Sequence, residues 1–363
     1  MKKYDAEDAV EVEGTRSQSR VGGPLNRSLH AAKATKQDEF YTQLSDIEKE
    51  LRYYTKHFKG KTVLCNCDDP KVSNFFHYFS HNFEKLKLKK LLTTCYKNNR
   101  VDLFSKNDSE RGIYLQYEGD KDGNRVPDPD EIGRHELKGD GDFRSEECIK
   151  LLKEADIIVT NPPFSLFREY IAQLVAMKKK FLVIANHNAI TYKEIFGLMK
   201  DNKIWLGYTH PANFIVPDHY EMREVRSWRD ADGTNWRSLG NACWFTNLDI
   251  AKRHEELILY KSYDPKDFPR YDNYDAIEVS RFADIPADYD AAMGVPITFL
   301  EKYNPDQFEI LGITDRGNVW GLKTKEYTQA DVRNPGDLNR RAAIKIGKAL
   351  KPTYARLLIR RKR

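Results

Sequence analysis

The four residues Asn161-Pro162-Pro163-Phe164 are the stretch of this chain whose types and spacing best suit chemistry. A residue before proline is kept out of the helical region, and proline has no N–H group. The side-chain carbonyl of Asn161 and the main-chain carbonyl of Pro162 are therefore predicted to form a rigid pair of hydrogen-bond acceptors, with the ring of Phe164 beside them. On these residues alone, an ordinary turn is the alternative.

Such a pair of acceptors suits the exocyclic amino group of a planar heterocycle. Each acceptor takes one N–H, and an aromatic ring stacks on the heterocycle. Accepting both hydrogens draws the nitrogen toward tetrahedral geometry and frees its lone pair, so these contacts are stronger in the transition state than in the ground state. The motif predicts transfer of a group from an activated electrophile to an amine, with no metal and no strong general base.

The surrounding sequence alternates short apolar runs with helical patterns, which is typical of βαβ units and of a mainly parallel sheet covered on both faces. Strands are expected at 61–67, 89–96, 156–160, 180–186, 203–209 and 242–248. Helices are expected at 38–58, 72–83, 145–155, 165–178 and 192–200, with Ser145 as an N-cap. Ligands bind at the carboxyl ends of strands in such sheets, and Asn161 lies at one of these ends.

Three further segments depart from this alternation. Residues 98–141 are polar and rich in Gly and Asp, and are expected to form a turn-rich insertion. Residues 308–324 resemble a hairpin that turns at 316–318, and residues 353–363 suit a strand or a short helix. The expected domains are a flexible tail (1–30), a catalytic domain (31–255) and a C-terminal recognition region (256–363).

The charge of the chain is unevenly distributed. Residues 333–363 contain eleven Lys and Arg against one Asp, a net charge of +10, so the overall +5 leaves −5 for the rest. Clustered cations release counterions from phosphate backbones, which favours a nucleic acid partner. A solvated basic tail is the alternative.

The composition argues against a membrane protein, a secreted protein and a cysteine-based metal site. No run of about 18 apolar residues is present, and the N-terminus has no apolar segment of the secretory kind. The five cysteines are scattered without metal-binding spacing, as expected of reduced thiols. We expect a cytoplasmic protein without a membrane segment.

Longer stretches of the sequence resemble the EcoRI-type adenine-specific (N6) DNA methyltransferases, also called modification methylases. The resemblance covers about residues 27 to 310 and includes DEFYT, VLCNCDDP, GDGDFRS, DIIVTNPPFSLFREY and FIVPDHYE. It implies a Rossmann-like fold with a mostly parallel seven-stranded sheet, S-adenosylmethionine as methyl donor and no metal. It also implies a monomer that flips an adenine out of double-stranded DNA of a bacterium or phage, with a cognate restriction endonuclease as a functional partner.

The resemblance also assigns roles to individual residues. Catalysis falls to Asn161, Pro162, Pro163 and Phe164, and cofactor binding to Phe40, Tyr41, Thr42, Asn66, Asp68, Asp69, Asp142 and Phe143. Core packing, for the residues from 40 to 42, and helix capping, for the acids, are the alternatives.

Substrate binding is assigned to the C-terminal half of the chain. Phe214, with Tyr208 as second choice, is the ring expected on the other face of the base, and core packing is the alternative for each. His187 and Asn188 are candidates to line the pocket, and a structural role is the alternative for the histidine. Arg356, Arg360, Arg361 and Lys362 are the expected phosphate contacts. Methylation of RNA adenine or of protein glutamine, and a catalytically silent DNA-binding module, remain alternative functions.

Overall fold

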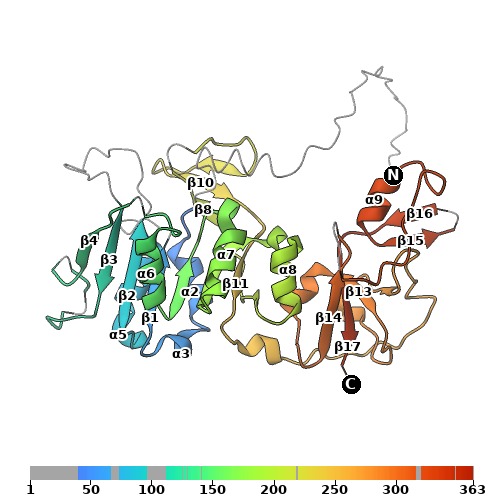
Figure 1. The fold of residues 1–363 in the computed structure, drawn as a ribbon, viewed down its shortest axis with the longest axis horizontal. Coiled ribbons are helices and arrows are strands. Elements are labelled where there is room, and N and C mark those ends of the chain that lie inside the picture. The colour runs from blue at the N-terminus through green and yellow to red at the C-terminus, as the bar shows by residue number, and fades with distance from the viewer. Residues whose placement is uncertain are drawn as a thin grey trace, which may run out of the picture.

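The computed structural model describes residues 40–66, 73–95, 112–124, 126–128, 130–139, 141–217, 220–315, 320–347 and 349–362 (Figure 1). The expected tail at 1–30, the expected cofactor contacts Asp68 and Asp69, and the expected turn at 316–318 lie outside these residues.

The largest sheet has eight strands in the order β4-β3-β2-β1-β5-β6-β11-β7. The bounds are β1 Thr62–Asn66, β2 Lys90–Cys95, β3 Ile113–Tyr117, β4 Gly133–Glu136, β5 Ile157–Thr160, β6 Lys180–Asn186, β7 Trp205–Leu206 and β11 Ala242–Thr246. The four central strands β2, β1, β5 and β6 are parallel, and antiparallel strands extend both ends. The predicted strand alternation is confirmed. The expected number of seven strands is wrong for the described residues, because the supposed turn-rich insertion supplies β3 and β4.

Helices cover both faces of this sheet (Figure 1). On one face lie α2 (Leu44–Leu51), α3 (Thr55–Phe58), α4 (Asn74–His81) and α5 (Phe83–Leu86). On the other face lie α6 (Glu146–Glu154), α7 (Phe167–Ala176) and α8 (Lys193–Lys200). Successive strand residues point to opposite faces, so Val63 packs with the first group and Leu64 with the second.

Two predictions about helices can be checked directly. The Ser145 side chain accepts a hydrogen bond from the Cys148 N–H at 3.2 Å, which confirms it as the N-cap of α6. The single helix expected at 38–58 is wrong at its start. Residues 40–42 are not helical, because Tyr41 exchanges two main-chain hydrogen bonds with Ile215 at 2.8 and 3.2 Å.

The C-terminal region is built on a four-stranded sheet in the order β12-β13-β17-β14. The bounds are β12 Ile277–Glu278, β13 Met293–Pro296, β14 Phe308–Ile313 and β17 Arg356–Arg361. The hairpin expected at 308–324 is wrong, since β14 pairs with β17 in antiparallel fashion. The final basic segment is a strand with neighbours on both sides, so the alternative of a solvated tail is wrong for residues 356–361.

Smaller elements complete the chain. A three-stranded sheet has the order β8-β10-β9, and a hairpin joins β15 to β16. Their bounds are β8 Asn213–Ile215, β9 Ser227–Arg229, β10 Asn235–Ser238, β15 Ala343–Ile346 and β16 Ala349–Pro352. The remaining helices are α9 Pro335–Arg340 and the 3-10 helices η1 Phe164–Leu166, η2 His187–Thr191, η3 Ala251–His254, η4 Phe282–Asp284 and η5 Ile297–Glu301.

The two large sheets share one hydrophobic core. Helix α8 lies beside β14 (Figure 1), and Phe196 of α8 meets Trp320 edge to face with ring centroids 4.8 Å apart. Buried side chains of both regions, including Ile195 and Ile310, belong to the same cluster. Among the described helices, none is long and apolar enough to cross a bilayer.

Candidate functional site

Asn161 directly follows β5, at the carboxyl end of the parallel strands. The neighbouring strand β1 is tied to β5 at the same end, because the Thr160 hydroxyl donates to the main-chain carbonyl of Asn66. The sequence analysis therefore placed Asn161 correctly relative to the sheet.

The side-chain amide of Asn161 is fixed by the segment before α2. Its Nδ2 donates to the Phe40 carbonyl at 2.6 Å and to the Thr42 hydroxyl oxygen at 3.2 Å. A carbonyl can only accept, so the NH2 group must face Phe40 and the Oδ1 atom must point elsewhere. Asn161 is 8% exposed, and its Oδ1 is buried with no hydrogen-bond partner among the described residues. This is the oxygen that the sequence analysis expects to act as an acceptor.

The two prolines lead directly into a helix. The Pro163 carbonyl accepts a hydrogen bond from the Leu166 N–H at 2.9 Å, which closes η1 ahead of α7. Pro162 is buried, whereas Phe164 is half-buried. The Phe164 ring lies 5.3 Å from the ring of Phe40, centroid to centroid, at 48°. The expected aromatic ring thus packs against Phe40, whose carbonyl binds the Asn161 amide.

Thr42 is held from a second side as well. Its carbonyl accepts from Nδ2 of Asn74, the first residue of α4, at 2.7 Å. Ser73 caps that helix by accepting from the Phe76 N–H at 3.2 Å. The predicted cofactor segment, Phe40 to Thr42, therefore also positions the predicted catalytic amide, a link that the sequence did not reveal.

Asn66 lies at the end of β1, where the resemblance placed a cofactor contact. It is buried, and its Oδ1 accepts a hydrogen bond from the hydroxyl of Tyr170 on α7. Tyr170 was not predicted as a site residue. Its only sequence signal is a tyrosine in the helix that follows the motif.

Asp142 and Phe143 occupy the loop before α6. The Asp142 carboxylate accepts from the Arg144 N–H at 2.9 Å and from Arg144 Nε at 2.8 Å. The side-chain hydrogen bond to Asp142, followed by the one to Glu169, raises the pKa of the Arg144 guanidinium. Phe143 is buried edge to face against Tyr170, at 5.1 Å. The N-cap is Ser145, so the alternative in which Asp142 caps α6 is wrong. An adenine amino group would compete with Arg144 for this carboxylate.

The two rings expected to stack on the base, Phe214 and Tyr208, both pack against other aromatic side chains. Phe214 is 0% exposed and lies 5.8 Å from the ring of Phe40. Tyr208 stacks on Tyr53 with centroids 3.8 Å apart, and its N–H donates to Glu50 at 2.8 Å. In this structure neither ring is presented to a substrate. Tyr220, 6.1 Å from Phe40, is a further aromatic residue that the sequence analysis missed.

The four expected phosphate contacts differ in exposure and in their partners. Arg356 is half-buried in an ion pair, because its Nη2 lies 2.8 Å from Glu278 Oε1 and the two side chains are 12% and 3% exposed. The assignment of Arg356 to phosphate is therefore wrong, because its charge neutralises a buried carboxylate. Arg360 is exposed and paired with Glu309 at 2.8 Å, and Lys362 is exposed and donates to a main-chain carbonyl. Arg361 is half-buried.

His187 and Asn188 follow β6 near the same end of the sheet. Burial, followed by the proximity of His210, lowers the pKa of the half-buried His187. The two histidine rings are 6.4 Å apart, and His210 lies 3.3 Å from Glu301. Asn188 is exposed. A lowered pKa keeps His187 uncharged at neutral pH.

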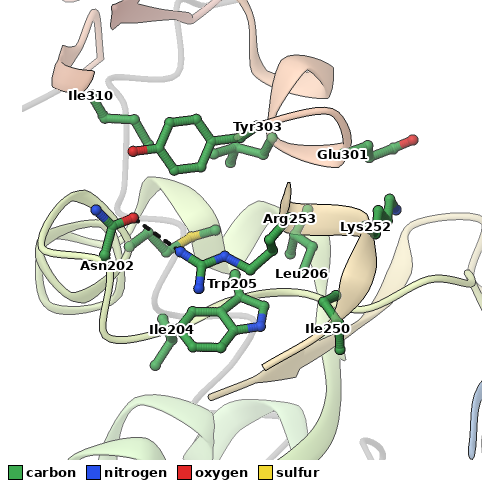
Figure 2. A pocket seen from close by; sticks show the side chains of 12 residues that line it. Asn202, Ile204, Trp205, Leu206, Ile250, Lys252, Arg253, Glu301, Tyr303 and Ile310 are labelled. Carbon is green, nitrogen blue, oxygen red and sulfur yellow. Dashed lines mark hydrogen bonds between the residues drawn. The ribbon is translucent and has the colours of Figure 1, made fainter. Parts of the chain in front are cut away.

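A pocket lies elsewhere, at the seam between the two large sheets (Figure 2). The Arg253 guanidinium lies 3.6 Å from the Trp205 ring and donates to Asn202 at 3.2 Å. Asn161 is not among its lining residues. We interpret this pocket as a gap in the packing between the two regions, because Arg253 already contacts the Trp205 ring and the Asn202 amide.

Comparisons with known proteins identify the family of this chain. Residues 28–362 match a family model described as adenine-specific methyltransferase EcoRI. The chain is 52% identical over 291 residues to the Type II methyltransferase M.EcoRI of Escherichia coli, covering 79% of this chain and 89% of that protein. It is 38% identical over 335 residues to M.MgeORF184P of Mycoplasma genitalium, covering 88% and 98%. It is 36% identical over 317 residues to M.MpnI of Mycoplasma pneumoniae, covering 84% and 93%. No solved structure matches the chain.

Proposed function

The chain belongs to the EcoRI family of adenine-specific methyltransferases, and we propose that it methylates N6 of an adenine within a specific sequence of double-stranded DNA. The observation that carries this proposal is the orientation of Asn161. Its amide NH2 is bound on one side, and its buried Oδ1 has no partner among the described residues.

In the proposed reaction, Asn161 Oδ1 and the Pro162 carbonyl accept the two hydrogens of the adenine amino group. When bound, S-adenosylmethionine supplies a methyl group on a positively charged sulfur, which is an activated electrophile. The acceptors orient the nitrogen lone pair and stabilise the positive charge that develops on N6. A methylated ammonium is acidic and loses its proton readily, so no strong base is required.

The cofactor is proposed to bind at the carboxyl ends of β1 and β5. This is the position at which sheets of this kind bind ligands, and it supports a Rossmann-like methyltransferase fold. Asn66 is the last residue of β1, and its carbonyl accepts a hydrogen bond from the Thr160 hydroxyl at the end of β5. The Thr42 hydroxyl accepts from Asn161, and Tyr41 is its neighbour in the chain. Asp142 and Phe143 stay proposed as contacts to the cofactor's adenine, with Asp142 exchanging Arg144 for the amino group.

The target base is proposed to leave the duplex and to stack on Phe164. Since Asn161 Oδ1 is buried, adenine reaches it only if neighbouring groups move, and Phe164 is half-buried beside Phe40. Arg360, Arg361 and Lys362 are proposed to neutralise phosphates. Acting on DNA, the enzyme is expected in the cytoplasm of a bacterium or of a phage-infected cell, as a monomer that protects DNA from a cognate endonuclease.

The test is incubation of the purified protein with S-adenosylmethionine and unmethylated plasmid, followed by base-resolution mapping of N6-methyladenine. We expect methylation at every copy of one short sequence and at few other adenines. Parallel reactions contain RNA and a glutamine-containing protein. Methylation of either in place of DNA would overturn the choice of substrate, and an unmodified plasmid would favour a catalytically silent DNA-binding module.

A further inference from the structure

The connection between β3 and β4 contains a twelve-residue stretch with the spacing of a metal-binding loop. Residues 120–131 read Asp-Lys-Asp-Gly-Asn-Arg-Val-Pro-Asp-Pro-Asp-Glu. The loop of EF-hand proteins takes side-chain oxygens from positions 1, 3 and 5, a main-chain carbonyl from position 7, position 9 often through water, and a glutamate at position 12. Counted from Asp120, these positions are Asp120, Asp122, Asn124, Val126, Asp128 and Glu131.

In the folded chain the two ends of this stretch meet. One carboxylate oxygen from each of Asp120, Asp122 and Glu131 lies within 4.8 Å of the others. Asp122 is exposed and Asp120 half-buried, whereas Glu131 is only 7% exposed. A turn that brings three carboxylates together concentrates negative charge, which a bound cation would offset.

Glu131 provides a second, independent observation that points to a cation. Its Oε1 accepts a hydrogen bond from the Lys121 N–H, but its Oε2 is buried without a hydrogen-bond partner among the described residues. A buried carboxylate oxygen that lacks a partner costs free energy. A glutamate at position 12 that offers both oxygens to a cation would remove this cost.

The hydrogen bonding of the loop also supports the comparison with EF-hand loops, although this loop differs from them in two ways. The Asp128 carboxylate accepts from the Glu131 N–H at 3.0 Å and so holds the last ligand in place. The EF-hand glycine of position 6 is replaced by Arg125, and Gly123, with φ of +85°, makes a left-handed turn two residues earlier. Strands flank the loop in place of helices, so we expect binding weaker than in the tight EF-hand sites.

We propose that residues 120–131 bind one calcium ion. Donors that are all oxygen favour calcium or magnesium over zinc, copper and nickel. Among the two, a loop with six ligand positions and a carboxylate that can bind through both oxygens favours the larger ion, because magnesium demands near-ideal octahedral geometry and retains its waters.

The site is structural, since it lies at the opposite end of the strands from Asn161. Tyr117, at the end of β3, pairs with Leu91 near the start of β2, whereas Asn161 follows the carboxyl end of the parallel strands. Asp120 also contacts α5 through its N–H, 3.4 Å from Glu84 Oε1. A bound ion would therefore fix the β3–β4 edge (Figure 1) without taking part in methyl transfer.

The test is calorimetric titration of the full chain with calcium chloride after removal of metals by a chelator. We expect one site with a Kd on the order of 10⁻⁵ to 10⁻³ M. Saturating calcium should raise Tm by about 2–5 °C. Magnesium should bind at least about tenfold more weakly. No binding at millimolar calcium would overturn the proposal, and equal binding of magnesium would overturn the choice of ion.

Three substitutions locate the binding. Glu131→Gln removes the buried ligand, and Asp122→Asn removes an exposed one. Each should weaken calcium binding by about tenfold or more, which is 1.4 kcal/mol per factor of ten. The matched control is Asp130→Asn, because Asp130 is exposed and stands at position 11 of the loop. Equal weakening in this control would show diffuse attraction to acidic groups and would contradict a defined site.

Discussion

At the scale of single residues, the central feature is the way in which Asn161 is oriented. An amide side chain can rotate to present either its oxygen or its NH2 group. Here the Phe40 carbonyl and the Thr42 hydroxyl oxygen both bind Nδ2, at 2.6 and 3.2 Å. Presenting the NH2 group to the substrate would set two acceptors, Oδ1 and the Phe40 carbonyl, against each other. The acceptor is therefore positioned before the substrate arrives, which is the condition for effective electrostatic catalysis.

The first prediction concerns Thr42. Thr42→Val keeps the shape of the side chain but removes the hydroxyl oxygen that binds Asn161 Nδ2. Losing about 1 kcal/mol of positioning should lower kcat by about five- to tenfold and change DNA affinity little. Single-turnover methylation measures this. The matched control is Thr191→Val, whose hydroxyl bonds to the Asn188 carbonyl in η2. A rate equal to that of the control would contradict a positioning role.

A second prediction concerns Arg356, which we assign to folding. Its guanidinium makes three contacts of 2.8 to 3.1 Å with Glu278, and the Tyr271 hydroxyl donates to the same carboxylate. Arg356→Ala leaves Glu278 buried and unpaired, which should lower the free energy of unfolding by about 3–5 kcal/mol. Arg360→Ala breaks an exposed pair and should cost at most about 1 kcal/mol. Urea unfolding compares the two, and equal losses would contradict the assignment.

At the scale of elements, helix α4 supports the site from outside it. Ser73 caps the helix, and Asn74 at its first position binds the Thr42 carbonyl. The helix N-terminus thus fixes residues 40–42, which in turn fix Asn161.

Asn74→Ala should therefore lower kcat by about three- to tenfold while the protein stays folded, since one neutral hydrogen bond contributes about 1 kcal/mol. Asn82→Ala is the matched control, because Asn82 makes a comparable bond to the Tyr78 carbonyl at the other end of α4. Thermal unfolding should shift alike in the two variants. If kcat also fell alike, α4 would have no specific link to the site.

The same elements show what the sequence can predict. Runs such as Ile157–Thr160 and Lys180–Asn186 are locally apolar and were predicted as strands, and Ser145 was predicted as a cap from neighbouring residues. Residues 40–42 were misassigned to a helix because their partner, Ile215, is distant in the sequence. The pairing of β14 with β17 was missed for the same reason. Local patterns carry no information about such contacts.

In the candidate site, too, local features were predicted from the sequence and tertiary contacts were not. The motif from Asn161 to Phe164 was predicted from its own chemistry, and its position at the end of β5 is confirmed. Phe214 and Tyr208 were chosen as aromatic residues in suitable segments, yet their rings pack against Phe40 and Tyr53. The direction in which a ring points depends on tertiary packing, so sequence alone did not decide it.

At the scale of the whole molecule, the basic charge of the C-terminal region is built into a sheet. Strand β17 lies between β13 and β14, so removing this segment would disrupt the sheet as well as remove its charges. Contacts to DNA must therefore be tested by substitution of exposed side chains.

Arg360→Gln combined with Lys362→Gln should weaken DNA binding and reduce the slope of log K against log salt by up to about 1.8, because each phosphate that a protein neutralises contributes about 0.9 to that slope. Both side chains are exposed, so stability should change little. Lys49→Gln combined with Lys200→Gln, on helices of the other region, controls for net charge. An unchanged slope in the variant that lacks the charges of Arg360 and Lys362 would show that these residues do not touch DNA.

The most direct test of the account is the methylation rate of Asn161→Ala, measured in a single turnover with plasmid DNA and S-adenosylmethionine. Removing this oriented acceptor should reduce the rate by at least about 10²- to 10³-fold, as loss of an electrostatic donor or acceptor does in other enzymes. DNA affinity should stay within about twofold, and Asn82→Ala, at the far end of α4, should keep full activity. A rate for Asn161→Ala close to that of the unchanged protein would contradict the proposed mechanism.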